Sequence, residues 1–157
     1  MPHKIRVAVI GEGENLTRLI RAILEKQVIP ANNMFISAKN QTAKEAAAGY
    51  DVVLCEDEAA AVVKSEIVLV PASKREMGTV LAPVSQCTRT RTVVPVCEDP
   101  RVNADFILER VQFGTEVVSA TLSRDENGKL SVQFDASRSA RIFLHQPCRD
   151  LVNALID

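Results

Sequence analysis

A glycine-containing turn near the N-terminus is the segment with the clearest capacity for ligand chemistry. Gly11, Glu12 and Gly13 follow an apolar run and precede an amphipathic segment. In that setting the first glycine permits a tight turn, and the second lets the backbone approach a pyrophosphate at the N-terminus of a helix. The turn therefore predicts a dinucleotide-binding loop. The alternative is a plain strand-ending turn, because Gly-x-Gly alone is a weak signal.

Three residues depart from a complete Gly-x-Gly-x-x-Gly pattern. Leu16 occupies the third glycine position, where we expect it to push the helix away or to point into the phosphate space. Glu12 and Glu14 bring carboxylates into the same loop. A carboxylate about 4 Å from a phosphate costs on the order of a few kcal/mol at an effective dielectric of about 20. Either both side chains turn to solvent or the loop does not hold a pyrophosphate.

The segment from His145 to Cys148 is a second candidate for chemistry. We expect Pro147 to open a helix, and a thiol at a helix N-terminus can have a lowered pKa. With the histidine nearby, Cys148 could be a nucleophile or half of a metal site. The chain has only His3 as another histidine, so we favour a segment without chemistry and predict no metal site.

Other reactive or charged side chains show no catalytic pattern, and the sequence identifies no catalytic residue. We interpret Cys55 and Cys97 as small buried apolar residues. The scattered arginines are interpreted as a solvated face; they are Arg89, Arg91, Arg138, Arg141 and Arg149. The acidic residues Asp99, Asp105 and Glu109 do not form the carboxylate pair that general acid–base catalysis needs.

Strands and helices alternate over residues 4–113, which would position the turn. The apolar runs predict strands over 4–10, 34–37, 52–54, 67–70 and 92–96. Helical spacing predicts helices over 16–24, 42–48, 56–63, 75–84 and 102–111. This rhythm is typical of a Rossmann-like α/β fold with a doubly wound, mainly parallel sheet and right-handed crossovers.

The pattern changes over residues 114–157. Alternating residues predict strands over 116–123 and 129–135, joined by a turn with an Asn-Gly signal at 127–128. A further strand over 141–145 and a last helix are expected after this antiparallel hairpin. We expect residues 1–157 to form a single domain, with 114–157 as an extension of it.

Composition indicates an ordinary globular chain. The 157 residues are 46% hydrophobic and carry a net charge of -1, so no whole-chain field attracts nucleic acid or an anionic membrane. No apolar stretch approaches the roughly 20 residues that span a bilayer, and no secretory signal is visible. The four cysteines form no C-x-x-C pair. We expect a cytoplasmic protein with reduced thiols, binding neither membrane nor nucleic acid.

Residues 4–81 resemble the N-terminal domain of pyrroline-5-carboxylate reductases. The resemblance rests on segments 5–24, 28–30 and 33–37, and on a later stretch from Val68-Leu69-Val70 to 77–81. The family's turn is typically Gly-x-Gly-Asn-Met-Gly, whereas Glu14, Asn15 and Leu16 fill the last three places here. The family's Lys-Pro after the fourth strand is replaced by residues 73–74, and the resemblance fades by about residue 123.

The resemblance implies an NADP site on two loops. Residues 11–15 would contact the pyrophosphate, and Ser37, Lys39 and Asn40 occupy the place where the family accepts the 2′-phosphate. No Asp or Glu ends the second strand, so the ribose of NAD lacks its usual partner. The alternative is a solvated polar loop. Nothing after Gly114 resembles the reductases' helical C-terminal domain, which supplies the substrate wall that hydride transfer needs.

Three functions remain open from the sequence. The first is a reductase-derived protein that binds NADP or another nucleotide without reductase catalysis and acts as a binding or regulatory module. The second is an active NADP-dependent oxidoreductase completed by a second subunit. The third is an interaction module that binds no nucleotide. The hairpin offers an edge that could pair across a two-fold axis, so we expect a homodimer or a partner protein.

Overall fold

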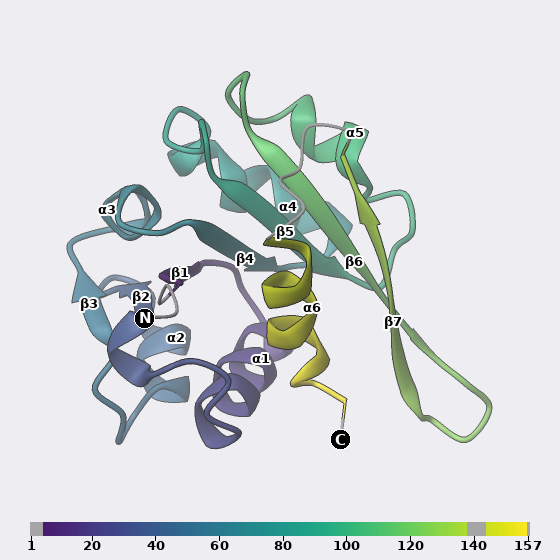
Figure 1. Cartoon of the computed structure of the whole chain (residues 1–157), viewed down its shortest axis with the longest axis horizontal. Coiled ribbons are helices and arrows are strands. Elements are labelled where there is room, and N and C mark those ends of the chain that lie inside the picture. The colour runs from purple at the N-terminus through teal and green to yellow at the C-terminus, as the bar shows by residue number, and fades with distance from the viewer. Residues whose placement is uncertain (1–4, 138–143, 157) are drawn as a thin grey trace.

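One mixed sheet organises the molecule in the computed structural model, which describes residues 5–137 and 144–156. Its seven strands lie in the order β3-β2-β1-β4-β5-β6-β7 (Figure 1). Neighbouring strands from β3 to β6 are parallel, and β6 and β7 are antiparallel. The strands are β1 (Val7–Val9), β2 (Met34–Ser37), β3 (Val53–Cys55), β4 (Ile67–Pro71), β5 (Thr92–Cys97), β6 (Glu116–Arg124) and β7 (Leu130–Ala136).

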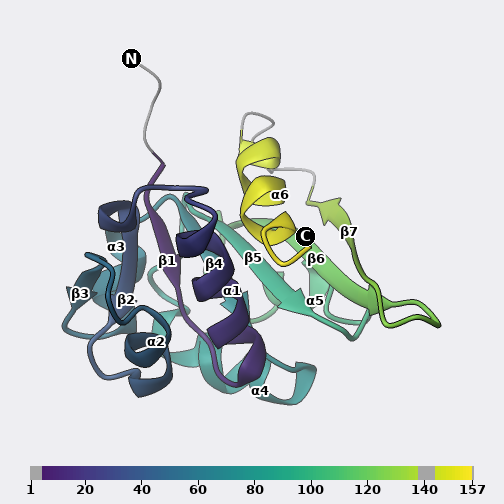
Figure 2. The same ribbon diagram turned by 90° about the horizontal axis from the view of Figure 1, so that it is seen from below.

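Helices cover both faces of the sheet, as the βα rhythm predicts (Figures 1 and 2). One face packs against α1 (Glu14–Glu25), α2 (Gln41–Ala46) and α6 (His145–Asn153). The other packs against α3 (Glu58–Val63), α4 (Lys74–Leu81), α5 (Ala104–Leu108) and the short helix η2 (Ala82–Val84). A further short helix, η1 (Ala31–Asn33), leads into β2. The predicted doubly wound α/β fold is confirmed. In the part of the chain described, no helix combines the length and apolar character needed to cross a membrane.

The buried strands carry apolar side chains toward both helical layers. Val7 and Val9 of β1 belong to the core under α1, whereas Ala8 and Ile10 belong to the core under α4. All five residues of β4 are buried. An uninterrupted apolar run is expected wherever both faces of a parallel sheet are covered, and such runs are the reason that these strands can be predicted from the sequence.

Helix α1 is fixed on the sheet by an apolar face at helical spacing. Leu16, Leu19, Ile20, Ile23 and Leu24 are each at most 3% exposed. Burying a side chain of this size contributes about 1.5–3 kcal/mol relative to leaving it in water. The expectation that Leu16 would point into the phosphate space is wrong, because its position in the helix directs it to the core with the other four.

The C-terminal hairpin forms as its turn residues predict. The Asp125 Oδ1 atom accepts hydrogen bonds from the backbone N–H groups of Asn127 and Lys129, at 2.9 and 2.8 Å. Gly128 has a φ of 78°, which glycine adopts without steric cost. The hairpin extends beyond the helical layers at one end of the sheet (Figure 1).

Two expected elements differ from the structure. The helix expected over 102–111 is only α5, because the Asn103 side chain caps it at Phe106 N and Arg110 N turns back to Ile107 O in a tight last turn. The strand expected over 141–145 lies mainly outside the described residues, as do Arg138 and Arg141. His145 was wrongly placed in that strand, and it is the first residue of α6.

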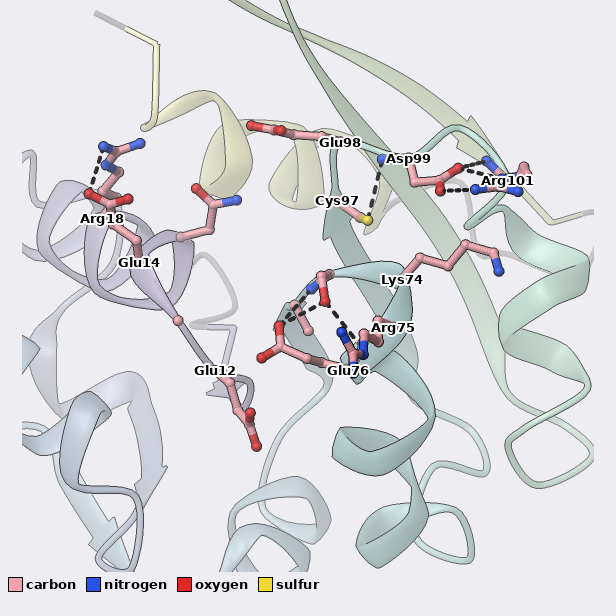
Figure 3. Close-up of a pocket in the computed structure, with 14 residues that line it drawn as sticks. Glu12, Glu14, Arg18, Lys74, Arg75, Glu76, Cys97, Glu98, Asp99 and Arg101 are labelled. Carbon is pink, nitrogen blue, oxygen red and sulfur yellow. Dashed lines mark hydrogen bonds and ion pairs between the residues drawn. The ribbon is translucent and has the colours of Figure 1, made fainter.

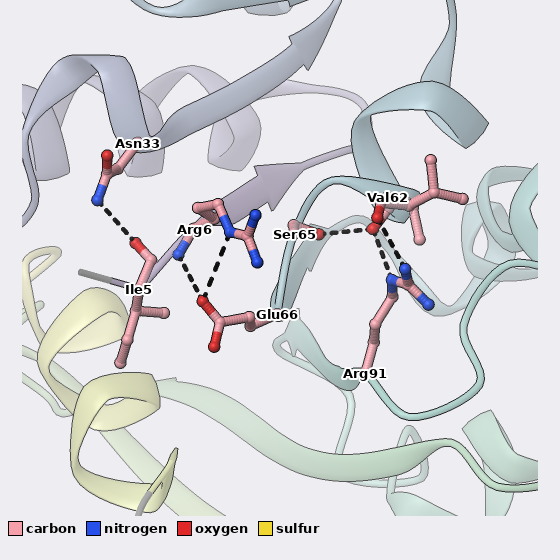
Figure 4. A network of polar contacts seen from close by, with 8 residues as sticks. Ile5, Arg6, Asn33, Val62, Ser65, Glu66 and Arg91 are labelled. Carbon is pink, nitrogen blue, oxygen red and sulfur yellow. Dashed lines mark hydrogen bonds and ion pairs between the residues drawn. The ribbon is translucent and has the colours of Figure 1, made fainter. Parts of the chain in front are cut away.

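Arg91 directly precedes β5, and its side chain is hydrogen-bonded to the end of α3 rather than solvated (Figure 4). Its guanidinium donates to the carbonyls of Val62 and Val63 at 2.8 and 2.7 Å, and to the Arg89 carbonyl at 2.9 Å. A cation at the last carbonyls of α3 complements the negative end of the helix dipole. The expectation of a solvated Arg91 is therefore wrong, and its role in the described structure is to cap α3.

Candidate functional site

The glycine turn lies where the direction of the sheet's winding reverses. Strand β1 has β2 on one side and β4 on the other, and the turn directly follows β1. Ligands of open α/β sheets bind outside the carboxyl ends of the strands at such a switch point. The described structure therefore places Gly11, Glu12 and Gly13 at the position that the fold favours for a ligand.

Gly11 is required by its contact with the neighbouring strand. Its φ is 144°, and a Cβ atom on it would lie 2.2 Å from the Pro71 carbonyl oxygen. The same oxygen accepts a hydrogen bond from Glu12 N at 3.2 Å. The loop therefore passes too close to β4 for any side chain at this position, which explains the first glycine on structural grounds alone.

Gly13 is required by its conformation and leaves the start of α1 open. It stands at the N-cap with φ 85° and ψ -169°, a region essentially restricted to glycine. No heavy atom lies within 4 Å of the place where a Cβ would be. No side chain caps α1, whereas polar side chains cap α2, α3, α4 and α5. The first N–H groups of α1 thus remain available to an anion.

The two carboxylates of the turn both face solvent. Glu12 and Glu14 are exposed, so the first of the two expected alternatives holds. The Glu14 Oε1 atom lies 2.9 Å from Arg18 Nη2, one helical turn along α1. Figure 3 shows Glu14 turned toward Arg18 and Glu12 pointing away from both. The negative charge of Glu14 is therefore compensated locally by a neighbouring cation.

Two cavities flank the turn. The larger, with a volume of about 740 Å³, lies between the starts of α1 and α4 and the loop after β5 (Figure 3). The second, of about 550 Å³, lies toward the loop between β2 and α2. Glu12, Gly13 and Glu76 line both cavities. An extended ligand that crosses the turn would therefore have one end in each cavity.

Charged side chains in the larger cavity are held mainly by their own neighbours. The Ser73 hydroxyl and backbone form a capping box with Glu76, and hydrogen bonds from both groups lower the pKa of the Glu76 carboxyl. Side-chain and backbone hydrogen bonds from Arg101 lower the pKa of Asp99 to about 2. The Arg101 Nη2 atom lies 2.7 Å from Asp99 Oδ2. These groups order the loops around the cavity rather than acting as proton donors or acceptors near neutral pH.

The predicted phosphate-accepting loop borders the second cavity. Lys39 is exposed and lines it. Ser37 is 1% exposed, and its Oγ atom accepts from Lys39 N at 3.1 Å. The Asn40 Oδ1 atom caps α2 at Ala43 N, and its Nδ2 atom donates to Gly11 O at 3.1 Å. Asn40 thus joins the two predicted loops, and Lys39 is the member of the three with an exposed charge.

The segment from His145 to Cys148, the second candidate for chemistry, offers no accessible nucleophile. Cys148 is fully buried in the core, and desolvation raises its pKa to about 12. A lowered thiol pKa, the less favoured of the two interpretations, is contradicted, because the thiol is buried in the core rather than exposed at the helix start. The His145 Nε2 atom is buried, with no hydrogen-bond partner among the residues described. Those residues include no group of three side chains able to hold a metal ion.

Sequence reasoning missed several residues of the larger cavity. Ser73 and Glu76 follow the Ser-x-x-Glu pattern of a capping box, a signal that could have placed the start of α4. The spacing of Glu14 and Arg18 is a signal for an ion pair on one helical face. Cys97, expected only as a buried residue, is 4% exposed and also borders this cavity.

Comparisons with known proteins identify structural neighbours only. No protein-family model and no curated protein sequence matches the chain. A pyrroline carboxylate reductase from Plasmodium falciparum, solved with NADP bound, superposes with a TM-score of 0.74 at 15% identity, over 97% of this chain and 55% of that one. A pyrroline-5-carboxylate reductase from Coxiella burnetii gives 0.77 at 11% identity, over 98% and 57%.

An imine reductase from Myxococcus stipitatus, in complex with NADP+, gives a TM-score of 0.69 at 17% identity, over 96% of this chain and 52% of that one. The chain therefore spans about half the length of the reductases that it matches. At these identities the likeness concerns the fold, and it confirms the predicted Rossmann-like architecture. The described chain has the α/β fold found in pyrroline-5-carboxylate and imine reductases, over about half of their length.

Proposed function

We propose that the chain is a reductase-derived nucleotide-binding module that binds NADP(H) across the Gly11–Gly13 turn. The observation that carries this proposal is the uncapped N-terminus of α1, which opens between two cavities at the switch point of the sheet. Backbone N–H groups and the helix dipole at such a terminus favour a pyrophosphate. The nicotinamide half would occupy the larger cavity, and the adenosine half the smaller one.

The choice of NADP rests on the loop after β2. A carboxylate that would hold the ribose of NAD is absent from Ser37, the last residue of β2, and from the two residues that follow it. Lys39 offers an exposed ammonium group at the same cavity, suited to a 2′-phosphate. We therefore expect NADPH to bind more tightly than NADH.

We further propose that the chain alone does not catalyse hydride transfer. The larger cavity is open to solvent at Glu98 and Arg101, both of which are exposed. A hydride acceptor must be held against the nicotinamide by a second wall that excludes water. A second subunit could supply that wall, which keeps an active oxidoreductase as the competing function.

We propose a homodimer in a reducing, cytoplasmic environment. Strand β7 ends the sheet as described, so its outer edge could pair with a second copy across a two-fold axis. All four cysteines are free thiols, which suits a reducing compartment. Light scattering after size-exclusion chromatography should give twice the mass of the 17.2 kDa chain. A monomer mass at micromolar concentration would refute the proposed dimer.

Calorimetric titration with NADPH, NADH and ATP tests the proposed function. NADPH should bind with the highest affinity, without oxidation when pyrroline-5-carboxylate is added. Turnover of that substrate would instead favour the oxidoreductase. No heat and no thermal shift with any of the three ligands at millimolar concentration would leave an interaction module that binds no nucleotide.

A pair of glycine substitutions locates the ligand. Gly13→Asp places a carboxylate before the N–H groups of α1, so NADPH affinity should collapse while the fold survives. Gly49→Asp is the matched control, because Gly49 has φ 89° and, like Gly13 at φ 85°, open space where a Cβ would be. Its φ is similar to that of Gly13, yet Gly49 lies outside both cavities. Equal affinities of the two variants would place the ligand away from the turn.

A further inference from the structure

The side chain of Asn40 makes hydrogen bonds in two directions. Its Oδ1 atom accepts from Ala43 N at 3.0 Å and so caps α2, whereas its Nδ2 atom donates to Gly11 O at 3.1 Å. An amide suits this double role because it carries an acceptor and a donor on one planar end. Asn40 therefore joins the loop after β2, to which it belongs, with the glycine turn, which lies 29 residues earlier in the chain.

The bond from Asn40 holds one peptide group of the turn. The Gly11 carbonyl and the Glu12 N–H belong to the same planar peptide unit and lie on opposite sides of it. The carbonyl accepts from Asn40 Nδ2, and the N–H donates to Pro71 O at 3.2 Å. Both polar ends of this peptide are thus tied, one to the loop after β2 and the other to β4. Its orientation sets the path of the chain toward the first turn of α1.

The glycines on either side of Glu12 make such ties important. Gly11 has φ 144° and Gly13 has φ 85°. Glycine restricts its own backbone angles less than any other residue, so hydrogen bonds rather than side-chain sterics must hold the turn. The turn borders both cavities. A ligand that contacts two loops at once binds only to the fraction of molecules in which both loops are correctly placed.

We propose that Asn40 is a positioning residue, which keeps the Gly11–Gly13 turn and the loop after β2 in the arrangement that suits a ligand spanning both. It acts through the Gly11 carbonyl, whereas the exposed charge of its loop belongs to Lys39. The proposal rests on the proposed function in assigning a pyrophosphate to the turn and a 2′-phosphate to the loop. Loss of the link weakens a ligand that contacts both loops and spares one that contacts a single loop.

Replacing Asn40 by serine breaks the link and keeps the cap. A serine hydroxyl at the N-cap accepts from the same backbone N–H, but its shorter side chain does not also reach Gly11 O. Asn103→Ser is the matched control, because Asn103 caps α5 by accepting from Phe106 N at 3.0 Å and lies outside both cavities. Both variants exchange a capping amide for a hydroxyl, and only Asn40→Ser loses a bond to the turn.

Titration with NADPH and with adenosine 2′-monophosphate measures the effect of the link. Asn40→Ser should bind NADPH about three- to tenfold more weakly than the wild type, the change that corresponds to one neutral hydrogen bond. Its affinity for adenosine 2′-monophosphate, which carries no pyrophosphate, should stay within about twofold by NMR titration. Asn103→Ser should keep both affinities. A loss of global stability alone would leave the ratio of the two affinities unchanged, so this ratio separates positioning from capping.

Nitrogen relaxation of the Glu12 and Gly13 amides tests the link without a ligand. Motion of these amides should increase in Asn40→Ser and stay at the wild-type level in Asn103→Ser. If the wild type binds neither ligand, the proposed function fails, and relaxation alone decides whether Asn40 positions the turn. Equal relaxation in the two variants would overturn the positioning role. An unchanged NADPH affinity in Asn40→Ser, or an equal weakening of both ligands, would also overturn it while leaving dinucleotide binding intact.

Discussion

Replacing Gly11 by alanine tests the packing of the turn against β4. The Cβ of an alanine would lie 2.2 Å from the Pro71 carbonyl oxygen, far inside ordinary van der Waals contact. The obstacle is backbone within a buried strand, so it cannot swing aside as a flexible side chain would. Either the loop or the end of β4 must move, and movement of that oxygen also disturbs the hydrogen bond from Glu12 N.

The expected loss of stability combines three effects. Holding a non-glycine residue at the φ of 144° observed for Gly11 costs about 1–3 kcal/mol. Opening space for the methyl group costs a further 1–3 kcal/mol or so. Weakening the Glu12 N–H bond adds about 0.5–1.5 kcal/mol. We therefore expect Gly11→Ala to lower the free energy of unfolding by about 2.5–7.5 kcal/mol, a large part of the roughly 5–15 kcal/mol typical of a domain.

Urea unfolding followed by far-ultraviolet circular dichroism measures this change as a shift in midpoint at constant slope. Gly78→Ala is the control, because Gly78 lies inside α4 with no neighbouring atom closer than Arg110 Nε at 4.0 Å. Alanine should stabilise that helix by about 0.5–1 kcal/mol. The same glycine-to-alanine substitution should thus lower the free energy of unfolding at Gly11 and raise it at Gly78. A Gly11→Ala variant within roughly 0.5 kcal/mol of the wild type would refute the close approach to β4.

Three further predictions concern charged and thiol groups. Arg91→Ala should lower the free energy of unfolding by about 1–2 kcal/mol, because the last carbonyls of α3 lose a charged donor, whereas Arg89→Ala should stay within about 0.5 kcal/mol; equal urea midpoints for the two variants would contradict this. Cys148 should resist iodoacetamide at pH 8 in the folded chain and react once urea unfolds it. The pKa of the Cys148 thiol is about 12 in the folded chain and about 8.5 in the unfolded chain. The stability that the protonated thiol contributes is therefore fully present below about pH 8.5 and is lost as the pH rises toward 12. The Asp99 carboxyl should titrate near pH 2 by NMR and return toward the ordinary range in Arg101→Ala. Because its folded pKa is lowered, the stability from this pair is present above about pH 4 and is lost as the pH falls through 2.

The strand and helix order was predictable because burial on both faces of a parallel sheet leaves continuous apolar runs. Residues 67–70, for example, need no long-range information to be interpreted as a strand. Helix ends were less predictable. Val102 is 2% exposed and continues the apolar pattern, yet it precedes the Asn103 cap, so periodicity extends past the start of α5. Local side-chain caps, rather than the apolar period, fix these boundaries.

The turn itself shows where a sequence motif stops being informative. A leucine at the third glycine position predicts a disturbed site, but Leu16 extends the apolar face formed with Leu19 and Ile20 and enters the core. The motif records which residue types a loop contains and not the direction in which each side chain leaves it. The Asn40 bond to Gly11 O joins loops that are 29 residues apart, and no local pattern indicates such a pairing.

The charges around the turn decide what the open start of α1 can hold. Glu14 is compensated by Arg18, and Asp99 by Arg101, so two of the nearby carboxylates carry their own counterions. Glu12 has an exposed carboxylate and stands between Gly11 and Gly13, at the border of both cavities. A pyrophosphate at the α1 N–H groups would therefore meet repulsion from Glu12 and from Glu76, which also borders both cavities, although solvent screens an exposed charge such as that of Glu12 effectively. The acidic character of the loop thus weakens an anion site without removing it, because the backbone donors that define the site remain uncapped.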